Sequence, residues 1–293
     1  METTAEKRED NNLENISTKK VHKILDRPIL STVLLLCFAL VLSSLLQIPK
    51  YLIWGANASG TAQHLYDVAT ALLLLVITEF IYTKVWFKGE FEGTLKGDIR
   101  NGFRIMIPVI VVDVALFIFD SIVAGGSMNS LVFVFATSLV AGIVEEITFR
   151  SLILANLMRI TKTYKGMLMS VVVTSVIFGV AHLTNLISGA NAGSTIMQVI
   201  SASIMGLFFA AVYMMCGSIV PLMVFHFGHD VLAFLLLKVN ESGATIRGVT
   251  TVSLIEELIL NIALLVMAVY ILRPVNFEQI RRKWDEKWAQ GQA

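Results

Sequence analysis

Residues 138–151 read SLVAGIVEEITFRS, and no other stretch of the chain constrains its structure as strongly. Glu145, Glu146 and Arg150 lie here inside a run that is otherwise apolar enough to cross a bilayer. One charged side chain near the middle of a membrane costs at least about 2.5–3.5 kcal/mol on insertion scales. Three such charges in one run indicate a functional site within a membrane-spanning helix.

The composition of the whole chain is that of a membrane protein. Of its 293 residues, 56% are hydrophobic and 15% are charged, whereas soluble domains are about one quarter charged. We therefore predict an all-α, polytopic helical bundle of about eight transmembrane helices. The predicted spans are residues 29–48, 65–87, 103–124, 130–158, 166–186, 195–216, 218–237 and 252–272. The cysteines Cys37 and Cys216 lie in apolar runs and signal neither a disulfide framework nor a cysteine metal site.

These spans form one domain, residues 29–272, with the motif-bearing part at residues 130–237. A polar tail (residues 1–28) precedes the domain, and a basic tail containing Trp284 and Trp288 (residues 273–293) follows it. Of the 23 lysines and arginines, 20 lie in the tails or toward one side of the predicted bundle, and only Lys50, Lys238 and Arg247 lie toward the other side. By the positive-inside rule, both termini are expected in the cytoplasm. Compact loops and the absence of targeting signals suggest a bacterial cell-membrane protein.

Two segments outside the spans could form interfacial helices. Phe91, Leu95, Ile99 and Phe103 are spaced as one apolar stripe, although an ordinary polar loop explains residues 91–104 equally well. The C-terminal tail is expected to rest on the cytoplasmic membrane surface.

The first charged motif divides into two parts on a helix. Glu146 and Arg150, four residues apart, share a face, so that the arginine can hold the glutamate ionised. Glu145 points about 100° away from Glu146 and can face a cavity. A purely structural buried ion pair is the alternative.

Two later spans carry histidines with partners four residues away. Phe178 and His182 share a face of the fifth span, and His226 and Asp230 share a face of the seventh, with His229 about 60° round from His226. Two imidazoles and a carboxylate in one turn suit a divalent metal or the activation of water. Polar groups that bond only one another inside the bundle would explain the same residues.

The three motifs together are more specific than any one of them. In their order and spacing, Glu145-Glu146-x-x-x-Arg150, Phe178-x-x-x-His182 and His226-x-x-x-Asp230 resemble the CPBP family of membrane proteases. That family includes the type II CAAX prenyl endopeptidases and the bacteriocin-immunity proteins. The resemblance covers about residues 130–237.

The resemblance also implies roles for these residues. Glu145 and His182 would activate a water, while His226 and Asp230 would bind the oxyanion or help to hold a metal. Glu146 would complete the catalytic set, with Arg150, Phe178 and His229 in support. The resemblance leaves open whether Glu145, His182 and His226 bind Zn²⁺ or a glutamate acts without metal. Asp230 departs from the asparagine of the prenyl endopeptidases and fits a ligand or a histidine-orienting partner better, because an ionised carboxylate cannot donate.

The first hypothesis is therefore an intramembrane endopeptidase that cleaves peptides or small membrane proteins at or within the bilayer. A non-catalytic immunity or scaffold protein that binds a peptide or a sensor kinase is the second, and an ion-coupled transporter is the third. The bilayer is an expected partner and nucleic acid is not.

Overall fold

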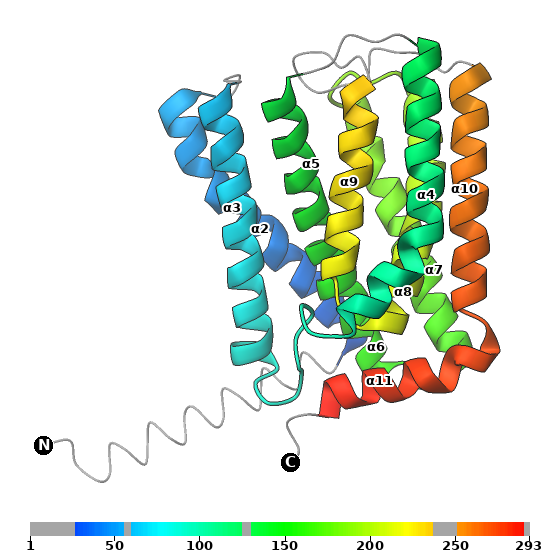
Figure 1. Cartoon of the computed structure of the whole chain (residues 1–293). Coiled ribbons are helices and arrows are strands. Elements are labelled where there is room, and N and C mark those ends of the chain that lie inside the picture. Colours follow the sequence, from blue (N-terminus) through cyan, green and yellow to red (C-terminus); the bar gives the residue numbers. More distant parts are fainter. Residues whose placement is uncertain (1–26, 56–59, 125–129, 237–250, 290–293) are drawn as a thin grey trace, which may run out of the picture.

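The computed structural model describes residues 27–55, 60–124, 130–236 and 251–289. Helices run between the two ends of a bundle, and one further helix lies across one of those ends (Figure 1). In chain order the elements are α2 (Pro28–Trp54), α3 (Thr61–Phe80), the π-helical turn η1 (Ile81–Trp86), α4 (Ile99–Ala124), α5 (Leu131–Glu146), the π-helix η2 (Ile147–Leu154), α6 (Ala155–Ile160), α7 (Tyr164–Ala181), the 3-10 turn η3 (His182–Leu186), α8 (Ala192–Cys216), α9 (Val220–Leu236), α10 (Thr251–Ile271), the 3-10 turn η4 (Pro274–Asn276) and α11 (Phe277–Ala289).

Seven helical runs in the described part of the chain are long and apolar enough to cross a membrane. One of them, Leu131–Ile160, joins α5, η2 and α6 into a single run that contains the first motif. An eighth apolar helix, Val220–Leu235, is shorter. The prediction of an all-α, polytopic bundle is confirmed, and the seventh predicted span is the one that falls short.

Helix α8 forms the centre of the bundle. Every residue from Phe208 to Cys216 is buried, as expected for a helix that is apolar on all sides and enclosed by other helices. It packs against α7 and α10 along its length, and Gly179 of α7 allows close approach because a side chain there would collide with Ser203. The polar residues of α5, α7 and α9 are therefore arranged around a rigid central element.

Helix α9 starts inside the protein. Gly217 ends α8 in the left-handed conformation (φ 74°), and the turn from Cys216 to Ile219 is buried. The sixth and seventh spans are therefore joined by a short turn. Non-helical backbone is tolerated at membrane depth only where protein groups satisfy it. The foot of α9 accordingly lies above α11 and not at the end of the bundle (Figure 1).

A segment from Phe91 to Asp98, here called the Phe91–Asp98 loop, supplies those groups. The Ile219 amide donates to Thr94 O at 2.9 Å, the Ser218 hydroxyl to Leu95 O at 2.7 Å, and the Asp98 amide to Cys216 O at 2.7 Å. The interfacial helix considered for residues 91–104 does not form, because α4 begins only at Ile99. The loop alternative holds, and the loop is buried at Phe91, Gly93 and Thr94 and exposed from Lys96 to Asp98.

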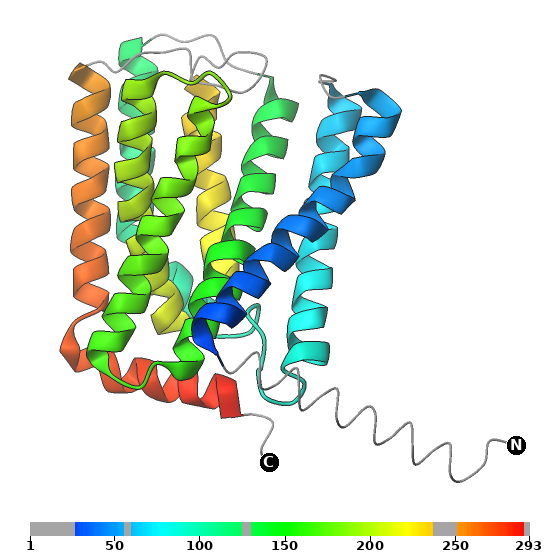
Figure 2. The ribbon, with the colours of Figure 1, turned by 180° about the vertical axis from the view of Figure 1, so that it is seen from behind.

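Helix α11 lies across the end of the bundle (Figure 2), and both of its tryptophans contact the protein. Trp284 is 2% exposed and donates its indole N–H to Met214 O, and Trp288 donates to Ala155 O. The predicted amphipathic helix is present. Its tryptophans donate to carbonyl groups of the protein, and contact of this tail with the cytoplasmic membrane surface stays a prediction.

Candidate active site

The first motif lies where α5 widens into the π-helix η2. Glu145 and Glu146 are the last residues of α5, and at the end of η2 the Ala155 amide bonds to Arg150 O, five residues earlier. Such wide turns are rare in proteins, but many of those that occur are found at functional sites, because they alter the direction of the side chains that follow.

Glu146 and Arg150 form the ion pair that their spacing predicts. Arg150 Nη1 lies 3.0 Å from Glu146 Oε1, and both side chains are buried, at 1% and 0% exposure. Arg150 also donates to Gly206 O at 3.4 Å, and its guanidinium carbon lies 4.4 Å from the centre of the Phe178 ring. A paired and stacked guanidinium can be accommodated inside an apolar bundle.

His226 is held by the same carboxylate oxygen. Its Nδ1 lies 3.0 Å from Glu146 Oε1, which also accepts from Arg150. A carboxylate ionised by an adjacent arginine only accepts hydrogen bonds, so His226 must carry a proton on Nδ1. The other ring nitrogen, Nε2, then faces the remaining carboxylates.

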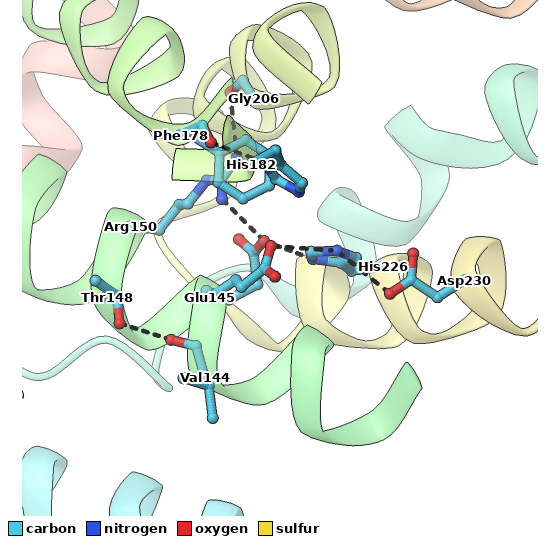
Figure 3. Close-up of polar contacts among 10 residues, drawn as sticks. Val144, Glu145, Thr148, Arg150, Phe178, His182, Gly206, His226 and Asp230 are labelled. Atoms are coloured by element: carbon cyan, nitrogen blue, oxygen red, sulfur yellow. Dashed lines mark hydrogen bonds and ion pairs between the residues drawn. The ribbon is translucent and has the colours of Figure 1, made fainter. Parts of the chain in front are cut away.

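Glu145 and Asp230 flank this second nitrogen (Figure 3). His226 Nε2 lies 3.7 Å from Glu145 Oε2 and 3.7 Å from Asp230 Oδ2, which are ion-pair distances too long for hydrogen bonds. Within the described residues, Glu145 Oε2 is a buried atom without a hydrogen-bond partner. The three polar atoms thus converge at a spacing that allows each to bond to a small oxygen-containing group between them.

His182 completes the set from the end of α7. Its Nδ1 lies 3.0 Å from Phe178 O, and since a carbonyl only accepts, this nitrogen also carries its proton. The Phe178 ring packs edge-on against both histidines, with its centre 5.2 Å from that of His182 and 6.2 Å from that of His226. The inclination of α7 across the bundle (Figure 2) and the 3-10 turn that begins at His182 bring it to the site.

His229 does not join this group. Its Nδ1 lies 3.1 Å from both oxygens of Asp113 on α4, and its ring stacks on Phe225. Asp113 therefore links α4 to α9 through a hydrogen bond with His229.

Residues 127–232 match the family model described as type II CAAX prenyl endopeptidase Rce1-like. The similarity to that family covers about a third of the chain. Searches of curated proteins and of solved structures return no match. At the level of the family, the match supports a multi-pass membrane protein with CAAX-type protease chemistry, and the Rce1-like segment contains all three motifs described above.

The side chains of the Rce1-like segment do not form a metal site as they are placed. No group of three or more His, Cys, Asp or Glu residues in the described part of the chain could hold a metal ion. His182 and His226 each use Nδ1 on a protein acceptor, which leaves one nitrogen each beside Glu145. The predicted Zn²⁺ ligands Glu145, His182 and His226 thus share one region without forming a coordination shell.

Sequence reasoning missed the contribution of α8. Phe209 places its ring 5.5 Å from that of His226, and 5.2 Å from the Arg150 guanidinium carbon. A Cβ atom on Gly206 would lie 3.1 Å from the Phe178 ring. Any residue other than glycine would therefore require that ring to move. Neither residue stands out in an apolar helix, and no signal in the sequence singles them out.

The close contact between α5 and α9 is at Gly142. A Cβ atom on Gly142 would lie 3.0 Å from Met223 O and 3.2 Å from Phe227 N. A Cβ atom on Gly228 of α9, by contrast, would meet nothing within 4 Å. Gly142, one turn before Glu146, therefore sets the distance between the glutamates and His226.

Proposed function

We propose that the protein is an intramembrane endopeptidase in which Glu145 activates a water for attack on a peptide carbonyl. The observation that carries this proposal is the convergence of Glu145 Oε2, His226 Nε2 and Asp230 Oδ2, with the glutamate oxygen left without a protein partner. A hydrolase inside a membrane needs a base for water and a donor for the oxyanion, and this arrangement can provide both.

In the proposed reaction, Glu145 takes a proton from the water, and the hydroxyl adds to the carbonyl carbon. His182, held at Nδ1 by Phe178 O, orients the water through its second nitrogen. The protonated Glu145 then returns its proton to the amine nitrogen as the peptide bond breaks. The products are one carboxyl group and one amine, and no other reactant is needed.

His226 would stabilise the oxyanion formed in this step. In its imidazolium form, Nε2–H donates to the developing negative charge while Nδ1–H stays on Glu146. Asp230, four residues along α9, balances the charge of the ring and orients Nε2–H. A carboxylate suits that role better than direct donation to the oxyanion, which would require it to be protonated.

The decisive experiment uses purified protein in liposomes with three fluorogenic probes. These are a farnesylated CAAX-terminated peptide, the same peptide without farnesyl, and a single-span hydrophobic peptide. We expect the wild type to cleave at least one probe and Glu145→Gln to be slower by about 10²–10⁴-fold. Glu257→Gln, which changes an acid of α10 away from the site, is the matched control and should cleave normally.

Equal cleavage by wild type and Glu145→Gln would refute the proposed role of Glu145. If the wild type leaves all three probes intact, the proposal fails, and the alternative of a peptide-binding membrane protein gains support.

No step in this reaction passes through a metal, which gives a separate prediction. Since the described side chains form no three-ligand set, cleavage should continue after treatment with 1,10-phenanthroline. Elemental analysis should also find the same metal content in wild type and Glu145→Gln. Stoichiometric zinc that is lost in the variant would show that Glu145 is a ligand.

A further inference from the structure

The Phe91–Asp98 loop connects elements that are far apart in the sequence. Its Thr94 donates its amide and its hydroxyl to Glu79 of α3, at 2.8 and 2.7 Å, and accepts the Ser151 hydroxyl at 3.0 Å. Ser151 directly follows Arg150. On its other side the loop bonds the buried turn before α9, through Ile219 and Ser218. The loop therefore touches both the η2 segment behind Arg150 and the foot of the His226 helix.

Lys287 of α11 holds this loop in place. Its ammonium donates to Gly93 O at 2.7 Å and to Lys96 O at 2.8 Å, and lies 3.6 Å from Glu92 Oε2. The Glu92 amide in turn donates to Lys287 O at 2.8 Å. Burial lowers the pKa of Lys287, and the Glu92 carboxylate opposes that shift. Lys287 is 3% exposed and donates to two carbonyl groups. Its ammonium group is therefore part of the packed structure and is not a solvated surface charge.

The tryptophans of α11 reach the other elements of the site. Trp284 stacks edge-on with Tyr213, with ring centres 5.0 Å apart, and Tyr213 lies one turn after Phe209 on α8. Trp288 donates to Ala155 O, immediately after η2, and stacks on Phe91 of the loop at 4.1 Å. Helix α11 thus contacts the ends of η2 and α8 directly and supports the start of α9 through the loop.

The geometry points to Lys287 as a positioning residue of the active site, with α11 as a clamp that sets the distance between Glu145 and His226. This inference rests on the proposed function, because it assigns a purpose to the geometry of that site. His226 lies about two helical turns after the first residue of α9, Val220. A shift of the Phe91–Asp98 loop would therefore change the position of His226 relative to the glutamates, while the rest of the helix packing stays in place.

The test compares Lys287→Met with Arg282→Met, which removes a neighbouring exposed charge of the same helix. Hydrogen exchange of the full-length protein in detergent should become several-fold faster in Lys287→Met at residues 91–98, 147–155 and 216–222 only. On a probe that the wild type cleaves, kcat should fall about 10-fold with KM within about twofold. Arg282→Met should match the wild type in both measurements.

Two results would overturn this assignment. Unchanged exchange at the three segments would show that Lys287 does not hold them. Faster exchange over the whole bundle, with activity lost in proportion to the folded fraction, would show a general structural role. The exchange measurement needs no substrate, so it tests the clamp even if the liposome assay refutes the peptidase.

Discussion

One oxygen atom organises the charges that make this chain unusual. Glu146 Oε1 accepts from both Arg150 Nη1 and His226 Nδ1, at 3.0 Å each. The buried arginine is therefore neutralised, and the histidine is fixed in one tautomer with Nε2 toward Glu145. The adjacent glutamates have different environments, since Glu146 is fully buried whereas Glu145 is 30% exposed at its side chain. Their division into a supporting and a chemical group follows from that difference.

The Arg150–Glu146 pair should show strong energetic coupling. We expect Arg150→Met to reduce the free energy of unfolding by about 3–5 kcal/mol, because it leaves a buried carboxylate without its cation. Glu146→Gln in the same chain should recover at least about 1 kcal/mol of that loss. Denaturant unfolding of both single variants and the double variant measures the coupling. Strictly additive losses would mean that the two side chains do not support each other.

At the scale of the elements, the spacing between α5 and α9 brings the motifs together. Gly142 allows the backbone of α5 to approach Met223 and Phe227 of α9, one turn before the glutamates. Two other features contribute to this arrangement. The wide turn of η2 follows Glu146, and the buried start of α9 places His226 at the level of the glutamates. None of these three structural features involves a residue that takes part in the proposed chemistry.

Two glycines provide a matched test of this spacing. Gly142→Ala should destabilise the protein by about 1–3 kcal/mol and slow cleavage, because the new methyl group crowds the α9 backbone. Gly228→Ala makes the same chemical change on α9, where the methyl group meets nothing within 4 Å, and should be neutral or stabilising by up to about 1 kcal/mol. Thermal unfolding and the liposome assay report on both variants. Equal effects at the two sites would contradict the importance of the α5–α9 contact.

At the scale of the whole molecule, the bundle has two unlike ends. The start of α2 and all of α11 lie at one end, and the connection that leads into α8 lies at the other (Figures 1 and 2). Described basic residues of the first end include Arg27, Lys162, Lys165 and Arg282. The positive-inside rule therefore continues to predict that this end faces the cytoplasm.

Thiol labelling can determine this orientation. In a Cys37→Ser background, where Cys216 is buried, Ala192→Cys should react with a membrane-impermeant maleimide in intact cells. Arg282→Cys, which is exposed on α11, should react only after lysis. The reverse pattern would invert the predicted topology.

Much of this organisation could be predicted because it depends on local patterns. Apolar runs and intramembrane charges located the helices, and spacings of four residues paired Glu146 with Arg150 and His226 with Asp230. The weaker predictions concerned segments whose partners are remote in the chain. His229 turned to Asp113, 116 residues earlier, and α11 buried its tryptophans against carbonyl groups of α8 and α6.

The sequence by itself determined the all-α membrane bundle, the three motifs and the pairs within single helices, because these follow from hydropathy and from the 3.6-residue period of a helix. Only the tertiary structure decided that α9 begins inside the protein, that Gly206 and Phe209 of α8 enclose Arg150, and that Lys287 binds the Phe91–Asp98 loop. Each of these depends on which buried backbone groups satisfy one another across the bundle. Hydrogen bonds between segments up to 194 residues apart leave no period or spacing in the sequence.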